Sequence, residues 1–448
     1  MKFVIIGGDA AGMSAASRAK RHMPEMDVIV LEKTEDVSYS ACGMPYNIAD
    51  ADREIGDLVV RTADVFRNKQ GIDLFTGYPV DFIDTKNKIV SGTIRHNGEP
   101  FRFLYDRLLI ATGGRPIIPD LPGFDLPGVV ALKSLQDGRR IKDHIKTNNV
   151  KKAVILGMGY IGLEMAEALR ERSIDVEMVK PGPDLLPWMP RDLAAVVKQE
   201  LDANQVDLHL GCKITRIEKT GDYLHVVCDD RTLNAEMVLV AVGINPNSEL
   251  ASRAGIETGA GNAIAVDRKL QTSDKAVYAA GDCTDAYHVV TGQKTWIPLA
   301  LRANRAGWAA ADNVCGKSVE LDSVAGTAVF KVFGLEVART GLSVEESHRF
   351  GFEPVDVTIQ TRSRAHAHPG AETIWVSLIG DHRTGRLLGA QMVGREGVAH
   401  RINAAAVALH AAMSVASFSQ TDLAYAPPFG PVWDPLLTAA NQLLKKMI

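Results

Sequence analysis

Residues 153–164 read AVILGMGYIGLE, a short apolar run followed by three glycines and the start of an alanine-rich stretch. Gly157, Gly159 and Gly162 have the spacing G-x-G-x-x-G, in which the glycines allow a tight turn, close approach to a pyrophosphate and close helix–strand packing. The apolar run predicts a buried strand, and the residues after the glycines predict a helix whose N-terminus faces phosphate groups. Because the motif lies between a strand and a helix, it indicates a dinucleotide site.

Residues 3–16, FVIIGGDAAGMSAA, repeat this arrangement at the start of the chain. Asp9 replaces the middle glycine, while Gly7, Gly8 and Gly12 remain. Both units are followed by a second apolar run, residues 28–31 and residues 176–179. The pattern therefore predicts strand–turn–helix–strand twice, as in two doubly wound nucleotide domains.

The residues that end the two second strands differ. Glu32 lies twenty residues after Gly12, where a carboxylate holds a ribose hydroxyl pair. The corresponding strand of the other unit runs into Lys180, which favours contact with a 2′-phosphate and so NADPH. Two alternatives stay open there, a solvated lysine and a ribose contact by Glu177.

Composition narrows the function classes. The chain has 448 residues, 46% of them hydrophobic and 23% charged, which suggests two to four domains. A net charge of −4 gives no global attraction to nucleic acid or to an anionic membrane, so neither is expected as a partner. The N-terminal apolar run is too short for a signal peptide, and no run of 18 apolar residues is present, so we expect a cytoplasmic protein without a membrane span.

Five scattered cysteines without C-x-x-C spacing predict a reduced protein with no disulfide and no bound metal. They are Cys42, Cys212, Cys228, Cys283 and Cys315. Cys42 lies in SYSACGMPY (residues 38–46), where Pro45 can occupy the first position of a helix. A helix N-terminus would lower the pKa of the thiol and favour the thiolate. The alternative is a small buried hydrophobe.

Further motifs follow along the chain. Residues 108–114, LLIATGG, predict a strand that enters a tight turn, and four prolines then crowd residues 116–127. Residues 277–282, VYAAGD, predict another strand and turn. Beyond about residue 320 the pattern changes to strands, such as 328–333 and 373–378, and to a helix over 401–413.

Together these motifs, with DLAYAPPF at residues 422–429, resemble the single-cysteine branch of the pyridine nucleotide-disulfide oxidoreductases and, within it, the coenzyme A-disulfide reductases. The resemblance implies an α/β fold with two doubly wound dinucleotide-binding domains, for FAD and NAD(P), and an α+β C-terminal dimerisation domain. The implied segments are 1–115 and 245–320 for the FAD-binding domain, 116–244 for the NAD(P)-binding domain, and 321–448 for dimerisation.

The resemblance also assigns residues. The cofactor-binding positions are Gly7, Gly8, Ala11, Gly12, Glu32, Lys33, Ala111, Thr112, Gly113, Gly157, Gly159, Tyr160, Ile161, Gly162, Glu164, Lys180, Gly243, Gly281, Asp282, Pro298 and Ala300. The substrate-binding positions are Arg18, Arg21, Ser38, Lys69 and His368. Cys42 is the implied catalytic cysteine, and Tyr425 is implied to reach the active site of the partner in a homodimer.

The implied activity is reduction of coenzyme A disulfide, or of a related persulfide or polysulfide, by NADPH or NADH through FAD and Cys42. Val37 stands five residues before Cys42, where the two-cysteine enzymes of this family carry a second cysteine. A dithiol mechanism is therefore not expected. One alternative is an NADH oxidase or peroxidase with a cysteine sulfenate, although Ala10 replaces the histidine expected there. Another is a redox-sensing flavoprotein.

The chain departs from the coenzyme A-disulfide branch at residues 364–370, RAHAHPG. Ala367 and His368 stand where that branch carries two tyrosines. His368 either replaces a tyrosine as an acid or belongs to a surface histidine pair. The physiological acceptor stays open for this reason.

Overall fold

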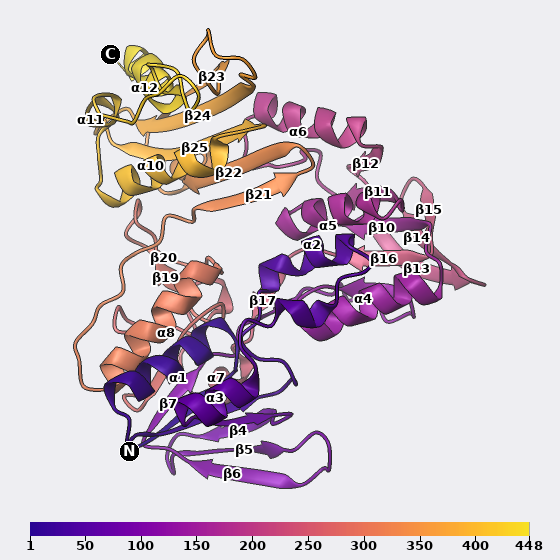
Figure 1. Ribbon diagram of the computed structural model, residues 1–448, viewed down its shortest axis with the longest axis vertical. Coiled ribbons are helices and arrows are strands. Elements are labelled where there is room, and N and C mark those ends of the chain that lie inside the picture. Colours follow the sequence, from indigo (N-terminus) through magenta and orange to yellow (C-terminus); the bar gives the residue numbers. More distant parts are fainter. Residues whose placement is uncertain (448) are drawn as a thin grey trace.

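The first glycine motif joins β1 to α1, and β1 is the central strand of a five-stranded parallel sheet, ordered β18-β7-β1-β2-β3 (Figure 1). The computed structural model describes residues 1–447. β1 forms because its apolar residues are buried on both faces, the environment of a central parallel strand. Helices α1 and α8 pack together against this sheet. Its elements are β1 (Lys2–Ile6), α1 (Ala10–His22), β2 (Asp27–Glu32), α3 (Ala63–Gln70), β3 (Asp73–Thr76), β7 (Arg107–Ile110), α7 (Glu249–Arg253), β18 (Val277–Ala279) and α8 (Ala300–Val314).

The second glycine motif joins β10 to α5 in another five-stranded parallel sheet, ordered β12-β11-β10-β16-β9. The two sheets confirm the two doubly wound units predicted from the repeated motif. The elements of this unit are β9 (Val129–Ala131), α4 (Leu135–Thr147), β10 (Lys152–Leu156), α5 (Tyr160–Glu171), β11 (Asp175–Lys180), α6 (Arg191–Ala203), β12 (Val206–Leu210) and β16 (Met237–Val240).

Small antiparallel sheets flank both units, and a two-stranded ribbon of β8 and β17 links them. The ribbon lies where the chain leaves the first unit and where it returns, near residues 115 and 245. These elements are β4 (Val80–Asp84), β5 (Ile89–Thr93), β6 (Pro100–Leu104), β8 (Gly114–Pro116), β13 (Ile214–Thr220), β14 (Tyr223–Cys228), β15 (Thr232–Ala235), β17 (Ile244–Pro246), β19 (Ala286–Tyr287), β20 (Lys294–Thr295) and the 3-10 helix η3 (Ala260–Asn262).

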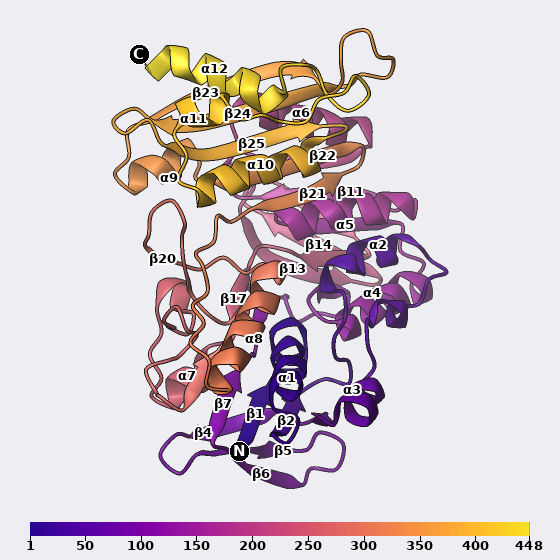
Figure 2. The same ribbon diagram turned by 60° about the vertical axis from the view of Figure 1, so that its left-hand side comes forward.

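The C-terminal part is a five-stranded antiparallel sheet, ordered β21-β22-β25-β24-β23, covered by helices. It lies at the top of Figures 1 and 2, at the opposite end of the molecule from the first sheet. This confirms the α+β C-terminal domain. Its elements are β21 (Ala328–Val332), β22 (Leu335–Gly341), α9 (Val344–Arg349), β23 (Pro354–Arg362), β24 (Thr373–Asp381), β25 (Leu387–Gly394), α10 (Val398–His410), α11 (Val415–Ser419) and α12 (Pro435–Met447).

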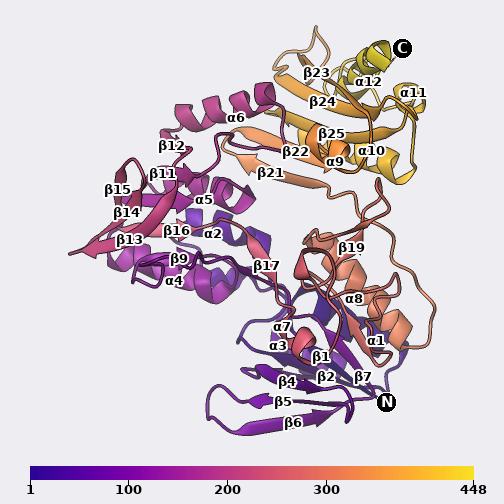
Figure 3. The ribbon, with the colours of Figure 1, turned by 180° about the vertical axis from the view of Figure 1, so that it is seen from behind.

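The segment around Cys42 lies between the two nucleotide units. It contains η1 (Ala41–Gly43), α2 (Met44–Ala49) and η2 (Ile55–Leu58). Met44 and Ile48 share a buried apolar cluster with residues of β10 and α5, so α2 packs on the second unit although it precedes it in sequence. Figure 3 shows α2 beside α5 and α4 from behind. Cys42, which follows the first unit's β2 in the chain, therefore lies at the junction of the two units.

The expectation that all five cysteines are reduced is wrong. Cys212 and Cys228 form a disulfide, while Cys42, Cys283 and Cys315 are free. The two partners are sixteen residues apart in sequence, and the turn from β13 into β14 brings them together. Local spacing gives no sign of such a pair, because the contact depends on the hairpin.

No helix within residues 1–447 has the length and apolar character needed to cross a membrane.

Candidate functional site

Cys42 lies on η1, exposed, immediately before α2. The residues before it are attached to the first glycine turn, because the Ser38 N–H donates to the Gly8 carbonyl at 3.0 Å. The Tyr39 N–H also points at the Asp9 carboxylate, at 3.4 Å. The cysteine segment and the first glycine turn are therefore one structural unit.

Tyr46 and Glu164 close the site on the side of the second unit. The Tyr46 hydroxyl, one turn after Cys42, donates to Oε1 of Glu164 on α5 at 2.8 Å. Burial raises the pKa of Glu164, and the hydrogen bond from Tyr46 partly offsets this. The structure thus brings Cys42 and Glu164 together, and it adds Tyr46, which lies within the quoted motif but was not singled out.

The prediction of a lowered thiol pKa is wrong for this structure. Although Cys42 is exposed at the surface, the surrounding protein partly removes water from its sulfur, and this desolvation raises the pKa of the thiol. The negative charge of Glu164 raises it further, and only Lys133 among the main neighbours lowers it. α2 has six residues, and Pro45 is its second residue rather than its first. The field of so short a helix does not outweigh burial and a carboxylate.

Lys133 is a site residue that the sequence analysis missed. Its ammonium group lies 3.1 Å from Oδ2 of Asp282, which follows β18 in the first unit. Lys133 precedes Ser134, the N-cap of α4, whose capping box with Asp137 fixes the start of that helix. Nothing in the local pattern separates this lysine from a solvated one, since its partner is 149 residues away.

The first glycine turn fits a dinucleotide. Gly7 has a φ of +111°, and a Cβ at Gly12 would collide with the Gly7 carbonyl, so both positions require glycine. The N-cap of α1, Asp9, makes no side-chain cap, which leaves the first N–H groups of the helix facing outward. Glu32 lies beside this turn and accepts the Gly8 N–H at 2.7 Å. Such a set can hold a pyrophosphate and a ribose.

Asp9 has a perturbed carboxyl group within this turn. Burial raises the pKa of Asp9 to about 6, while the hydrogen bond from the Tyr39 N–H opposes the shift. A group with this pKa carries a proton part of the time near neutrality. Asp9 can therefore stand next to bound phosphate with less repulsion than an ordinary aspartate.

The remaining positions assigned to the flavin surround this turn. Thr112 is tied to Asn247, whose amide donates to the Thr112 carbonyl at 2.7 Å and whose carbonyl accepts the Thr112 hydroxyl at 2.6 Å. Gly281 has a φ of +91° and packs against Ala11. The others are found as follows: Ala111 and Gly113 beside Thr112, Lys33 exposed after β2, and Pro298 and Ala300 at the start of α8.

The second glycine turn has room for a ligand. The Gly157 N–H donates to the Val179 carbonyl at 2.8 Å, which holds the turn to the end of β11. A Cβ at Gly159 would meet nothing within 4 Å. Tyr160 stacks tilted on Phe330 of the C-terminal domain, with ring centroids 4.7 Å apart. Ile161 and Gly162 continue α5, and Gly243 precedes β17 with a φ of +135°.

Lys180 and Glu177, the two candidates for a nucleotide contact at the end of β11, differ in how far their side chains are already engaged. The Lys180 ammonium donates to the carbonyls of Asp184 and Leu185, at 2.6 and 3.2 Å, and so spans its own loop. Glu177 is buried inside β11 and paired with Lys152 and with His209. The Glu177 carboxylate is thus engaged by a lysine and a histidine, which disfavours the alternative that it holds a ribose.

The basic side chains of α1, Arg18, Arg21 and His22, are only partly available to a substrate. Arg18 makes two hydrogen bonds to the Asp312 carboxylate, at 3.0 and 2.9 Å, and His22 approaches the same group at 2.7 Å. The guanidinium also lies 5.7 Å from the ring centre of Trp308. Of the other predicted substrate residues, Arg21 and Lys69 are exposed. No sequence motif indicates Asp312, because it lies on α8, far from Arg18 along the chain.

The structure brings His368 close to the segment that carries Tyr425 and places both on the C-terminal domain. The Ala365 N–H of the histidine loop donates to the Pro427 carbonyl at 3.1 Å. Arg401 donates to the carbonyls of Ser363 and Phe429, which ties the two segments together. This domain lies at the far end of the molecule from α1 and α3 (Figures 1 and 2).

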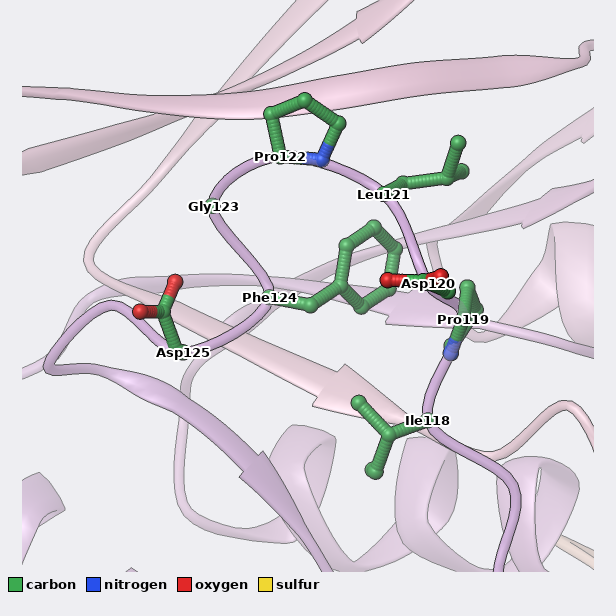
Figure 4. A pocket seen from close by; sticks show the side chains of 8 residues that line it. All are labelled: Ile118, Pro119, Asp120, Leu121, Pro122, Gly123, Phe124 and Asp125. Atoms are coloured by element: carbon green, nitrogen blue, oxygen red, sulfur yellow. The ribbon is translucent and has the colours of Figure 1, made fainter.

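A hollow on the proline-rich crossover contains none of the predicted residues (Figure 4). Its lining comes from one continuous segment, residues 118–125. The loop is fixed to β13 by the Ile217 N–H, which donates to the Pro122 carbonyl at 2.9 Å. The hollow is thus the inside of one loop.

The comparisons agree with this arrangement. A family model described as "Pyridine nucleotide-disulphide oxidoreductase" matches residues 1–307, and one described as its dimerisation domain matches residues 327–435. The chain is 40% identical to "NAD(P)H sulfur oxidoreductase (CoA-dependent)" of Pyrococcus furiosus over 444 residues, 99% of each chain. It is 34% identical to "NADH oxidase" of Methanocaldococcus jannaschii, covering 100% of this chain and 99% of the other. The structure of a NAD-dependent persulfide reductase from A. fulgidus superposes with a TM-score of 0.96 at 35% identity, over 100% of this chain and 83% of that one.

Proposed function

Because the chain belongs to the pyridine nucleotide-disulphide oxidoreductase family, we propose that it reduces coenzyme A disulfide, or a related persulfide or polysulfide, through Cys42. As a member of this family, the chain is a flavoprotein oxidoreductase that uses NAD(P)H. The identity of the electron acceptor is our proposal. One observation carries the proposal. A single exposed cysteine lies between two dinucleotide turns, with Val37 where a partner cysteine would stand.

The residues of this chain would bind the cofactor, hold the substrate sulfur and exchange protons with it. The turn at Gly7–Gly12 and Glu32 would hold FAD, which supplies hydride acceptance from NAD(P)H and two-electron delivery to sulfur. Cys42 would carry one half of the substrate in a mixed disulfide. When that S–S bond takes two electrons and one proton, it yields the Cys42 thiolate and a free thiol. Tyr46, held by Glu164 at 2.8 Å, is placed to keep a proton near this sulfur.

Two features support an anionic substrate such as coenzyme A. The exposed Arg21 and Lys69 lie in the last turns of the neighbouring helices α1 and α3. Arg18, although paired with Asp312, keeps a partly exposed guanidinium over Trp308. Coenzyme A carries phosphate groups that such cations recognise. The printed name of the Pyrococcus furiosus relative, a CoA-dependent sulfur oxidoreductase, points the same way.

A homodimer would complete the site. Large apolar side chains are exposed on the segment between α11 and α12, including Tyr425, Phe429, Val432 and Trp433. This segment lies within residues 327–435, which match the model of the dimerisation domain. Because it lies on a different domain from Cys42, we propose that Tyr425 acts at the Cys42 of a partner chain.

The test is an acceptor screen on FAD-loaded protein reduced with NADPH without oxygen. Coenzyme A disulfide, polysulfide, oxygen and peroxide are then added, and flavin reoxidation is followed. Reoxidation by coenzyme A disulfide or polysulfide supports the proposal. Fast oxygen consumption to water, with little disulfide turnover, would favour the NADH oxidase that the Methanocaldococcus jannaschii relative is named for.

Cys42→Ser is the matching variant. It should bind FAD and accept hydride as wild type does, because hydride transfer precedes use of the sulfur. Disulfide turnover should fall to background, by roughly a thousandfold or more. Cys315→Ser, a substitution of a free cysteine at the end of α8, is the control that should keep turnover. Full turnover by Cys42→Ser would remove this cysteine from the mechanism.

A further inference from the structure

Cys212 and Cys228 form a buried disulfide in the unit that carries the second glycine turn. Their Cα atoms are 6.0 Å apart, and their residues are 2% and 6% exposed. Neighbouring apolar side chains come from both sheets of the unit, for example Val179 of β11 and Leu224 of β14. The pair therefore clamps the three-stranded sheet to the edge of the parallel sheet.

The disulfide joins two segments that also meet through the backbone, because Ile214 and Cys228 are partners in the β13–β14 ladder. Cys212 follows β12 after one residue, and Cys228 is the last residue of β14. Beyond the S–S bond, the Asp229 N–H donates to the Lys213 carbonyl at 3.1 Å. Residues 229–231, which directly follow Cys228, are exposed.

Backbone bonds connect this clamp to the nucleotide site. The Cys212 N–H donates to the Lys180 carbonyl and the Gly211 N–H to the Gly182 carbonyl, both at 3.1 Å. One residue earlier, the Val179 carbonyl accepts the Gly157 N–H at 2.8 Å. The chain of contacts thus runs from the disulfide, through the loop at residues 180–182, to the first glycine of the turn.

We propose that Cys212 and Cys228 are a redox-controlled latch on the NAD(P)H site. In the oxidised state the disulfide fixes Cys212, and with it the loop at residues 180–182, so the nucleotide meets a preorganised edge. In the dithiol state the loop at residues 180–182 loses one of its restraints. Binding of the nucleotide must then order this loop, and the entropy cost weakens the affinity for the nucleotide. The inference needs only the family's NAD(P)H site and does not depend on which acceptor Cys42 serves.

The chemistry is thiol–disulfide exchange with a low-molecular-weight disulfide, RSSR, as the oxidant. One cysteine thiolate attacks a sulfur of RSSR, forms a mixed disulfide and releases RS⁻. The other cysteine attacks the protein sulfur of that mixed disulfide, closes the Cys212–Cys228 bond and releases a second RS⁻. The two cysteine protons end on the two RSH, so the pair loses two electrons and RSSR gains them. A dithiol reductant reverses the reaction.

The first test is chemical and uses FAD-loaded, full-length Cys42→Ser protein, so that the other reactive thiol is absent. The protein is treated with glutathione disulfide or with dithiothreitol, denatured in one alkylating agent, reduced, and labelled with a second. We expect Cys212 and Cys228 to carry the second label after the disulfide and the first after dithiothreitol. Cys283 should carry the first label in both samples, as an internal control. The first label on Cys212 and Cys228 under both treatments would overturn the proposal.

The second test is binding, measured with NADP⁺ because it does not reduce the flavin. After the reagents are removed, the reduced protein should bind NADP⁺ at least about threefold more weakly than the oxidised protein, a change smaller than one net hydrogen bond. Cys212→Ser/Cys228→Ser should bind like the reduced form and lose the difference, whereas Cys315→Ser should keep it. Equal Kd values for the two redox states of the same protein would overturn the latch even if the double variant fails to fold.

Discussion

Asp9 shows how a single side chain at the first glycine turn departs from the ordinary pattern. It occupies the place of a glycine, it is partly buried, and its pKa is raised to about 6 by desolvation. Because the folded chain holds this proton more tightly than the unfolded chain, the associated stability is fully present below pH 3.8. It is lost as the pH rises through about 6.

Asp9→Asn should therefore stabilise the FAD-free protein at alkaline pH. Asparagine keeps an oxygen for the Tyr39 N–H but carries no charge, so up to about 3 kcal/mol of burial cost disappears above pH 6. The melting temperature of the variant should exceed that of wild type at pH 8, and the gap should shrink as the pH falls to 5. Asp52→Asn, at an exposed position, is the control that should change little. A pH-independent gap would mean that the carboxyl of Asp9 is not perturbed.

Lys180 remains a predicted contact for the 2′-phosphate of NADPH. Its ammonium has three donors, and two are used by the carbonyls of Asp184 and Leu185. Lys180→Met keeps the stem and removes the charge, so kcat/KM for NADPH should fall about tenfold relative to NADH. Steady-state kinetics with both nucleotides measure this ratio. An equal fall for both would show that Lys180 only holds its loop.

At the scale of single residues, sequence motifs could predict the site residues whose position depends on nearby residues in the chain. Glu32 follows its glycine turn at fixed spacing and does lie beside Gly8. Lys133 and Asp312 act through partners 149 and 294 residues away, so no motif could reveal them. Arg18 was predicted to bind substrate, and its pairing with Asp312 depends on the packing of α8 on α1.

At the scale of elements, each glycine turn works because a helix approaches a strand more closely than any side chain permits. α1 and α5 both begin where a Cβ on the third glycine would collide with the carbonyl of the first. Strands and turns of this kind could be predicted from the sequence. The helix predicted over 401–413 lies instead at Val398–His410, because alanine-rich composition does not mark where a helix begins.

Gly12→Ala should abolish stable FAD binding. The added methyl group collides with the Gly7 carbonyl, so α1 must shift away from β1. The N–H groups at the start of α1 then no longer point at the pyrophosphate of FAD. Gly56→Ala is the matched control, because a methyl group there meets nothing within 4 Å. The flavin-to-protein ratio after purification should be near zero for the first variant and unchanged for the second. A normal ratio for Gly12→Ala would separate this turn from FAD.

At the scale of the whole molecule, polar bridges fix the C-terminal domain to the second nucleotide unit. Glu167 on α5 pairs with Lys331 and accepts the Phe333 N–H, and Glu200 on α6 pairs with Arg395. These contacts are partly buried, and they hold the C-terminal sheet in a defined orientation to α5. The segment with Tyr425 is thereby presented on a rigid support, away from the Cys42 of its own chain.

Mixed dimers test whether Tyr425 serves the partner's cysteine. Cys42→Ser homodimers should be inactive with the disulfide, and Tyr425→Phe homodimers should lose about a hundredfold in turnover if the hydroxyl supplies a proton. In a mixed dimer purified through two different tags, one site combines both defects. The other site combines the intact Cys42 of one chain with the intact Tyr425 of the other. If the tyrosine acts across the interface, this dimer should recover about half of the wild-type turnover, since one of two sites is complete. If Tyr425 acts within its own chain, neither site is complete, and turnover should stay near the level of the Tyr425→Phe homodimer. Recovery therefore requires both a dimer and an exchange of residues between its chains, which a purely structural role for Tyr425 cannot produce.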